Sequence, residues 1–441
     1  MTPDPRVRQL LDDAKMIVVC GPGGVGKTTS AAALGVTAAM HSNRRVLVLT
    51  VDPAKRLATA LGLESLGNVE VPVPLEGSTG TLTMAMIDTK SSWDDMIRRH
   101  APDPATRDRV LANELYKTLT SRFVHSHDYV VTERLYEARE SGHFDLVIVD
   151  TPPSRSALSV LDAPGRMQQF FGSRLLKLLT APAQSRLLSL ASRPFFLVAD
   201  RILGAAFLSD ISEFFTLFRT MEGPIVQRAK RVGALLSEPG TSYLVVTSAE
   251  SVAMNEAGYL VSELRQRGHR LEGVLVNRVV PNRLAHGAAD RASNLAASHD
   301  VGRQALAAAE TEIAAIAERH AGALQRVVSW EVEVLVSEAR SGDITDTESL
   351  LSLGEAIYRG CETRAEGVGG LDPRELTGST RKNGREPCPP SSNSQATTRN
   401  FLTTTLHISL RSFLSGECWL TSRLPTCFST CQWSVRRAPT G

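Results

Sequence analysis

A glycine-rich stretch near the amino terminus carries the residue types that bind phosphate. The segment Gly21–Thr29 has the sequence GPGGVGKTT and fits the pattern G-x-x-x-x-G-K-[ST]. Glycines let the backbone approach phosphate oxygens, so that several N–H groups can surround one anion. In this pattern Lys27 neutralises the β- and γ-phosphates, and the Thr28 hydroxyl binds Mg²⁺. The stretch therefore predicts a phosphate-binding loop for a nucleoside triphosphate and its magnesium ion.

The elements that flank this loop are those that the pattern requires. Residues 16–20 form an apolar run that predicts a buried strand, and residues 28–40 are rich in alanine and contain no proline, which favours a helix. Such a unit places loop N–H groups and the positive end of the helix around one site. The alternative is a glycine-rich turn in an unrelated α/β protein. The predicted phosphate ligands are Gly21, Gly23, Gly24, Val25, Gly26, Lys27, Thr28 and Thr29.

Two aspartates follow predicted buried strands and would complete the chemistry. Residues 45–51 form an aliphatic strand that leads into Asp52, and residues 144–150 form a second one that ends in Asp150. In open α/β sheets, ligands bind beyond the carboxyl ends of the strands. A run of aliphatic residues that ends in aspartate is typical of the strand whose acid supports Mg²⁺ opposite the phosphate loop. An ordinary strand that ends in an acidic turn residue has the same pattern. The two prolines that follow force the chain out of the sheet, which suits a segment that senses the γ-phosphate.

The alternation of predicted strands and helices indicates an α/β fold of the P-loop NTPase type, with a mostly parallel central sheet flanked by helices and an inserted helical subdomain. Further strands are predicted at 82–88, 243–247, 271–278 and 326–332, and further helices at 251–266, 288–320 and 346–359. The predicted divisions are 1–90 and 241–360 for the two parts of the ATPase core, 91–141 for a helical insert, 142–164 for the second aspartate strand and its switch, 165–240 for the helical subdomain, and 361–441 for a disordered tail.

Composition narrows the class of protein. The 441 residues carry a net charge of +2, with 42% hydrophobic and 22% charged residues, which is typical of a globular protein. So small a charge gives no strong attraction to nucleic acid, and we expect no nucleic-acid partner. The amino terminus has no apolar signal, and no apolar run is long enough to span a membrane. Only Cys20 among the six cysteines precedes residue 361, which favours a reducing cytoplasm.

Residues 165–240 differ in composition from the alternating core. Eight of the 13 phenylalanines fall between Phe170 and Phe218, at spacings that predict helices separated by prolines. In one interpretation these rings form the core of the helical subdomain. In the other, they line an exposed apolar groove that binds a hydrophobic client.

Residues 361–441 show no persistent helical or strand period and are rich in serine and threonine, so we expect them to be disordered. An out-of-frame or extended carboxyl terminus without an evolved role would also explain their tryptophans and phenylalanines. A zinc site at Cys418, Cys427 and Cys431 would require a fourth ligand and a C-x-x-C pair, and the segment supplies neither.

Together these motifs make the chain resemble the ArsA-type ATPases, which include the arsenite-pump ATPase and the eukaryotic ATPase that targets tail-anchored membrane proteins. The resemblance covers about residues 14–360. It rests on the loop sequence GGVGKTT, on Asp52 followed by Pro-Ala, on Asp150 followed by Thr-x-Pro, and on Asn277 at the end of a late strand. Bacterial sequences described as anion-transporter ATPases share the Ser-Arg-Ser-Ala sequence found here at residues 154–157, and the wider class has a deviant form of the phosphate loop.

The resemblance implies an ATPase that uses ATP and Mg²⁺ and works as a homodimer or heterodimer. It implies catalytic roles for Lys27 and for Asp52, which positions or deprotonates the attacking water. Asp150 would support the metal through a water molecule, Asn277 would recognise adenine, and residues 151–158 would form the second switch. ATP would close the dimer and hydrolysis would open it, presenting or hiding a surface for a hydrophobic client. We expect a cytoplasmic protein that reaches a membrane only through a partner.

One departure from the family concerns catalysis. The family has a lysine directly after the first loop glycine, which reaches the phosphates of the partner across the dimer, whereas this chain has Pro22. A cation of this kind is worth a factor of about 10³–10⁵ in rate. Hydrolysis is therefore slow, or another cation replaces the lysine, or a second subunit supplies the charge. Lys55, Arg56 and Arg155 are nearby candidates, and we expect Arg155, within the switch, to be the catalytic one.

Other departures concern the partners. No cysteine lies between Cys20 and Cys361, so the chain cannot hold arsenite through cysteines in that region, nor an iron–sulfur cluster or a zinc shared by a dimer. The histidine of the family's second switch is replaced by Ser-Arg-Ser-Ala at residues 154–157. Two functions stay open: an active Mg-ATP-dependent switch, and a weakly active subunit that regulates a second ATPase of the family. A partition-type ATPase would require a basic DNA-binding surface or a carboxyl-terminal membrane helix, and the sequence supplies neither.

Overall fold

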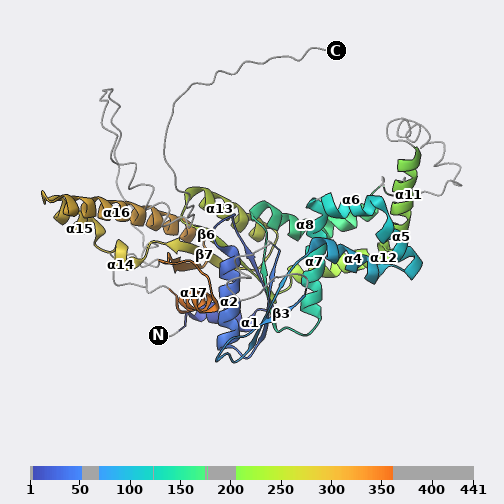
Figure 1. Ribbon diagram of the computed structural model, residues 1–441, viewed down its shortest axis with the longest axis horizontal. Coiled ribbons are helices and arrows are strands. Elements are labelled where there is room, and N and C mark those ends of the chain that lie inside the picture. The colour runs from blue at the N-terminus through green and yellow to red at the C-terminus, as the bar shows by residue number, and fades with distance from the viewer. Residues whose placement is uncertain (1–2, 52–68, 123, 174–175, 177–204, 361–441) are drawn as a thin grey trace, which may run out of the picture. The chain divides into compact units, whose positions relative to one another are not determined.

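The computed structural model describes residues 3–51, 69–122, 124–173, 176 and 205–360, and an eight-stranded sheet lies at the centre of this part (Figure 1). The strands are β1 (Met16–Cys20), β2 (Arg45–Thr50), β3 (Val71–Val73), β4 (Thr81–Met86), β5 (Leu146–Asp150), β6 (Thr241–Ser248), β7 (Leu271–Val279) and β8 (Val334–Glu338). Their order is β3-β4-β2-β5-β1-β6-β7-β8. Neighbours run parallel except β3 and β4. The predicted α/β class with a mostly parallel sheet is confirmed.

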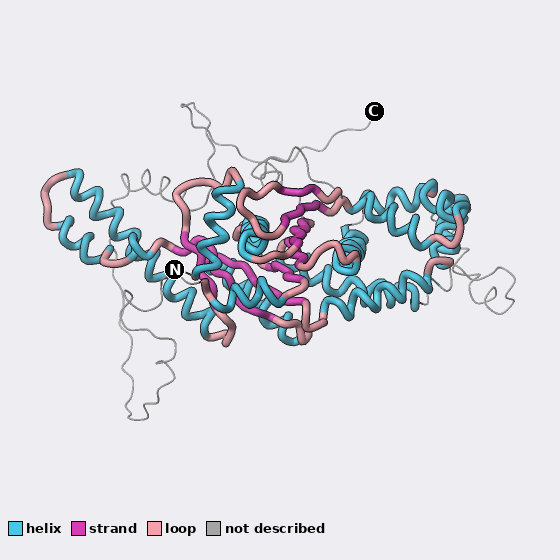
Figure 2. Tube along the Cα trace, turned by 90° about the horizontal axis from the view of Figure 1, so that it is seen from below, coloured by secondary structure: helices cyan, strands magenta, loops and turns pink. Residues whose placement is uncertain are grey.

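Helices cover both faces of the sheet, as Figure 2 shows. They are α1 (Pro5–Asp13), α2 (Lys27–His41), α4 (Thr89–His100), α5 (Pro104–Ala112), α6 (Glu114–Arg122), α7 (Val124–Glu140), α8 (Ser154–Gly172), α11 (Ala205–Arg219), α12 (Glu222–Leu236), α13 (Ser251–Gln266), α14 (Asn282–Ala285), α15 (Ala288–Ala296), α16 (Val301–Val328) and α17 (Thr347–Arg359). Parallel strands need such crossovers, because the chain must return to the end of the sheet where the previous strand began before it starts the next strand. Among these helices, none is long and apolar enough to cross a membrane.

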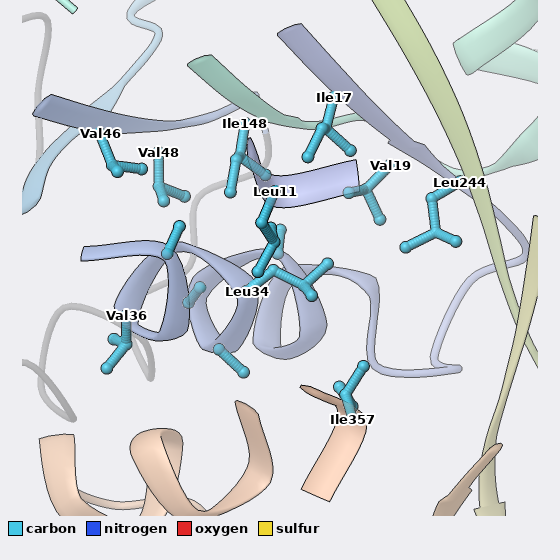
Figure 3. Packing of buried hydrophobic residues seen from close by; sticks show 14 of the residues in the cluster. Leu11, Ile17, Val19, Leu34, Val36, Val46, Val48, Ile148, Leu244 and Ile357 are labelled. Carbon is cyan, nitrogen blue, oxygen red and sulfur yellow. The ribbon is translucent and has the colours of Figure 1, made fainter. Parts of the chain in front are cut away.

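The helix that follows the glycine-rich loop is packed between the sheet and a second helix. Leu34 of α2 is fully buried, and Figure 3 shows α2 between the strand residues Ile17 and Ile148 on one side and Ile357 of α17 on the other. The contact with α17 is close, because a side chain at Gly354 would overlap the backbone of α2. This packing fixes α2 and, with it, the first helical turn that ends the loop.

The opposite face of the sheet packs against α7, α8, α12, α13 and α16. Successive side chains of β1 divide between the two faces: Ile17 and Val19 belong to the cluster under α2, and Met16 and Val18 belong to the other cluster. A strand that is covered on both faces must be apolar at every position. This is why residues 16–20 show a continuous apolar run rather than an alternating one.

A third apolar cluster holds the helical subdomain together. It joins Met96 of α4, Phe171 of α8 and Phe218 of α11 with other side chains of α5, α6, α7 and α12. Helices from the predicted insert 91–141 and from the predicted subdomain 165–240 thus contribute to one core. Helix α8 continues from the sheet layer into this cluster without a break.

The phenylalanines of the helical subdomain pack largely on one another where their side chains are described. Phe171 and Phe214 each stack on Phe218, with ring centroids 5.3 and 5.6 Å apart, and all three are buried. Phe170 is 37% exposed at the edge of this group. These contacts favour the core interpretation for the described rings. Three of the eight have side chains outside the described part: Phe195, Phe196 and Phe207.

The prediction of a strand at 326–332 is wrong. Residues up to Val328 continue α16, and the last strand is β8. A short apolar run cannot be assigned by periodicity alone, and here the long alanine-rich helix that begins at Val301 extends into it. Strand β3 is absent from the prediction, and it contains Pro72. Proline has no N–H to donate, but an edge strand tolerates it because one side of that strand has no neighbour to bond. The predicted disordered tail, 361–441, lies outside the described residues.

A buried carboxylate lies among basic side chains where α4, α7 and α12 meet. Glu133 is 2% exposed, and its Oε1 accepts a hydrogen bond from Arg228 Nε at 2.9 Å. The same oxygen lies 3.4 Å from His100 Nε2. The Arg228 guanidinium also lies 4.0 Å from the ring centroid of Tyr136, so this arginine joins the ion pair to the aromatic packing. Removing Glu133 would leave the charge of Arg228, which is 19% exposed, with a longer contact of 3.9 Å to Glu137 Oε1.

We therefore expect Glu133→Ala to lower the free energy of unfolding by about 3 kcal/mol, the cost typical of breaking a buried ion pair. Chemical denaturation monitored by circular dichroism measures this change. The matched control is Glu213→Ala, because Glu213 pairs with Arg109 at the surface. That variant should lose less than about 1 kcal/mol. Equal losses in the two variants would contradict a special role for the buried pair.

Candidate active site

The loop between β1 and α2 takes a shape that its glycines permit. Gly26 ends the loop and caps α2 with a φ of 94°, in the left-handed region. A Cβ at this position would lie 2.5 Å from Asn277 Nδ2 at the end of β7. At the start of the loop, a Cβ on Gly21 would overlap the carbonyl oxygen of Val246 in β6. Glycine at both ends therefore lets the loop lie directly against the carboxyl ends of two neighbouring strands.

Carbonyl oxygens of the loop accept hydrogen bonds from other parts of the protein. The Ser154 N–H donates to the Gly21 carbonyl at 3.1 Å, and Asn277 Nδ2 donates to the Val25 carbonyl at 2.8 Å. In a trans peptide the C=O of one residue and the N–H of the next point in opposite directions. Holding the Val25 carbonyl on the protein side therefore turns the Gly26 N–H toward the side where an anion binds, whereas the residue after Gly21 is Pro22, which has no N–H.

Lys27 folds back over the loop. It is 7% exposed, and its Nζ donates to the Pro22 carbonyl at 2.8 Å. A phosphate oxygen carries negative charge and is a stronger acceptor for an ammonium group than a neutral carbonyl. The lysine is therefore placed to exchange this carbonyl for a phosphate oxygen when a nucleotide binds.

Hydroxyl and carboxylate oxygens gather beside the loop at the ends of three elements. Thr28 Oγ1 in α2 donates to Asp150 Oδ2 at 2.6 Å, and Thr50 Oγ1 in β2 donates to the same oxygen at 2.9 Å. Asp150 is 1% exposed. Such hard oxygen donors fit Mg²⁺, which proteins bind through one or two carboxylates together with waters and phosphates. Bound there, the ion would neutralise charge on the phosphates.

The segment after β5, predicted as the second switch at 151–158, is tied to several elements of the site. Thr151 Oγ1 donates to the Val19 carbonyl of β1 at 2.9 Å. At the start of α8, Ser154 Oγ donates to Glu256 Oε2 of α13 at 3.1 Å. The segment therefore contacts the central strand, the loop and α13, which packs on the same face of the sheet as α8, so its position depends on all three.

The structure describes only part of the predicted catalytic set. Asp52 and the candidate cations Lys55 and Arg56 lie outside the described residues. Arg155 lies in the first turn of α8, and its side chain is also outside the described part. Asn277 is buried, with its amide nitrogen on the loop and its Oδ1 accepting a hydrogen bond from the next residue in the chain at 3.0 Å.

Sequence reasoning missed three side chains at this site. Thr50 contacts Asp150, Glu256 contacts the start of α8, and the Nη1 of Arg278 donates to the Gly24 carbonyl at 3.4 Å. Thr50 and Arg278 both lie at or near the carboxyl ends of central strands, where open α/β sheets bind their ligands. The sequence could have indicated Thr50 and Arg278 as site residues, because both are polar residues at the ends of predicted strands.

Comparison with protein families agrees with this geometry. The model of the ArsA ATPase family, described as anion-transporting ATPase, matches residues 14–304. The chain belongs to this family. It is accordingly an ATPase with the P-loop NTPase fold.

Relatives of the chain match it over 60–64% of its length. An uncharacterised protein of Streptomyces coelicolor is 28% identical over 272 residues, which is 60% of this chain and 63% of that protein. The ATPase ARSA2 of Chlamydomonas reinhardtii is 25% identical over 63% of this chain and 72% of its own length. The ATPase ASNA1 homolog of Trypanosoma cruzi is 26% identical over 64% of this chain and 79% of its own length. Two of these three relatives are named as ATPases.

The position of Asp150 yields a test of the predicted magnesium site. We expect Asp150→Asn to lower ATP turnover by about 100-fold and to raise the Mg²⁺ concentration needed for half-maximal rate, because a bound metal supplies several kcal/mol of charge stabilisation. Phosphate release measured against Mg²⁺ concentration checks both effects. The control is Asp145→Asn, since Asp145 pairs with Arg45 at the surface beyond the opposite end of β5. Equal turnover in the two variants would remove Asp150 from the site.

The thiol that precedes the loop yields a second test. Cys20 ends β1, and burial raises the pKa of its thiol to about 12. Because the thiolate is the reactive form, we expect iodoacetamide at pH 8 to leave Cys20 unmodified in the folded protein and to modify it after denaturation. Peptide mass spectrometry distinguishes this cysteine from the five that lie at residue 361 and beyond. Equal modification of Cys20 in folded and denatured protein would refute the expectation.

Proposed function

We propose that this ATPase is a Mg²⁺-dependent switch in which ATP closes a dimer and hydrolysis opens it. Its helical subdomain presents or hides a surface for a hydrophobic client or a membrane partner. The observation that carries the proposal is helix α8, which begins at the phosphate-binding loop and ends in the aromatic cluster.

Helix α8 is continuous from the loop to the cluster, with Pro164 inside it. Its first residue, Ser154, donates its N–H to the Gly21 carbonyl. Near its other end, Phe171 stacks on a phenylalanine of α11. A helix of 19 residues is about 28 Å long. A shift of its first turn on loss of the γ-phosphate would therefore be carried to the subdomain by one rigid element.

The proposed roles follow from the positions described above. Lys27 and the loop N–H groups hold the phosphates of ATP, and Mg²⁺ is held by Thr28 and, through water, by Asp150. Asp52 positions or deprotonates the attacking water. Asn277 recognises adenine, as the family resemblance implies, although its amide would have to leave the Val25 carbonyl and the Arg278 N–H to do so.

A further part of the proposal concerns the cation that acts on the developing charge. Pro22 provides no charge in the loop. Arg155 directly follows Ser154, whose backbone and hydroxyl contact the loop and α13, so its backbone is close to the loop. We assign this cation to Arg155, acting within the chain or on the nucleotide of the partner.

The aromatic cluster supports a client surface at its edge rather than at its centre. Most of the described rings are buried, and Phe170 is the one with a large exposed fraction among them. Large contiguous apolar patches are typical of surfaces that bind apolar segments, and a single exposed ring does not form one, so Phe170 marks only where such a surface would begin. The surface would therefore extend from Phe170 when the subdomain opens.

The alternative is a weakly active subunit that regulates a second ATPase of the family in a heterodimer. The observation that favours it is again Pro22, because a sister chain with a lysine at this position would supply the charge in trans. In that case turnover would be slow for this chain alone and fast only after the sister chain is added.

One set of measurements distinguishes these functions. We expect light scattering to show a monomer or an open dimer with ADP, and a more compact dimer with a non-hydrolysable ATP analogue and Mg²⁺. We also expect the protein to release phosphate from ATP. Hydrophobic peptides should bind in one of the two nucleotide states. Arg155→Ala should lower turnover by at least about tenfold, and by as much as about 10³–10⁵-fold, which is the rate effect of a cation that stabilises the transition state. Arg56→Ala is the matched control.

Each outcome has a distinct meaning. Unchanged turnover in Arg155→Ala would refute the assignment of the cation to Arg155, and a fall in turnover in Arg56→Ala alone would assign the cation to Arg56 instead. Slow turnover that rises only when a second family member is added would support the heterodimer. A monomer in every nucleotide state that releases no phosphate and binds no peptide would contradict both functions.

A further inference from the structure

A bulge in β7 aims two consecutive side chains at the same loop. Pairing between β7 and β8 shifts register between Val276 and Val279, so that Asn277 and Arg278 together face one residue of β8. In a regular strand consecutive side chains point to opposite faces of the sheet. A bulge changes this by turning one of the two, and bulges are frequent next to active sites for that reason.

Arg278 adopts a backbone conformation that is unfavourable for its residue type. Its φ is 60°, and among the described residues only Glu331 is another non-glycine residue with positive φ. In this region the Cβ of an L-residue comes too close to the following carbonyl oxygen. The Arg278 N–H donates to Asn277 Oδ1 at 3.0 Å, which helps to hold the turn. Strain that is kept beside a binding site points to a function of the side chain.

The two side chains hold two successive carbonyl groups of the loop. Arg278 Nη1 donates to the Gly24 carbonyl at 3.4 Å, and Asn277 Nδ2 donates to the Val25 carbonyl at 2.8 Å. Each peptide N–H points away from the carbonyl of the preceding residue. The contact made by Arg278 therefore aims the N–H of Val25, and the contact made by Asn277 aims that of Gly26, toward the side where phosphates bind.

We infer that Arg278 is a positioning residue of the phosphate-binding loop: by holding the Gly24 carbonyl, it keeps the Val25 N–H aimed at the phosphates of the nucleotide. Its side chain is exposed and carries further N–H donors, so it also keeps a positive charge beside a loop whose second position is uncharged. This inference rests on the proposed function, because it requires the loop to bind nucleotide. It differs from the role of Arg155, since Arg278 acts through the loop backbone.

The test uses the full-length chain and the variant Arg278→Gly. Glycine adopts a positive φ without strain, so the bulge is kept while the guanidinium is removed. We expect the melting temperature to stay the same or to rise. The Kd for fluorescent ADP with Mg²⁺ should rise about tenfold, the loss typical of a hydrogen bond to a charged group. Turnover at saturating ATP should fall by about tenfold or more, since small displacements of positioning groups carry such costs.

Two further variants complete the test. Glu331→Gly relieves the same kind of backbone conformation at a φ of 55° beyond the end of α16, and it should change neither the Kd nor the turnover. Arg278→Lys keeps a positive charge and a donor, and we expect it to restore part of the lost affinity and turnover.

Three results would overturn the inference. If Arg278→Gly binds and hydrolyses nucleotide like the wild type, the side chain does not position the loop. If it loses affinity together with a clear fall in melting temperature that Glu331→Gly does not share, the role of Arg278 is structural. If the wild type itself binds no fluorescent ADP and releases no phosphate, the proposed function fails and the inference fails with it, which distinguishes this case from the first two.

Discussion

The carboxylate of Asp150 is buried at the carboxyl end of β5, where it accepts hydrogen bonds from Thr28 in α2 and Thr50 in β2. A charge in this position is tolerated only with hydrogen-bonding partners, because its desolvation would otherwise cost several kcal/mol. The carboxylate therefore fixes the start of α2 relative to two strands of the sheet. Since α2 also carries Lys27, the same constraint sets the distance between the lysine, the hydroxyl and the acid to which we assign the binding of phosphate and Mg²⁺.

The loop itself is held from the other side by the strands that follow in the sheet. Its carbonyl groups accept hydrogen bonds from Ser154 at the start of α8 and from Asn277 and Arg278 at the end of β7. These contacts come from segments that are far apart in sequence, and they leave the peptide N–H groups to face an anion. Because α8 leads from this contact into the aromatic cluster, the geometry of the loop and the geometry of the helical subdomain are coupled through one element.

Much of the fold was predictable from local patterns. The helix predicted at 251–266 has the same bounds as α13, and the buried strands were found because both faces of a central parallel strand are apolar. The strand predicted at 326–332 is wrong, because a few apolar residues at the end of a long helix have no period that distinguishes them from a strand. Likewise, Pro72 concealed an edge strand whose existence depends on a neighbour rather than on its own residues.

The sequence by itself determined the nucleotide-binding unit, because strand, glycine loop and helix are contiguous and their chemistry depends on spacing along the chain. It also determined that Asp150 ends a buried strand. Only the tertiary structure decided that Thr50 contacts this acid and that both helical inserts share one core. The bulge that turns Arg278 toward Gly24 was likewise decided there. These features depend on strand order, strand register and contacts between residues up to 254 positions apart in the chain, and hydrophobic patterns along one segment carry no information about them.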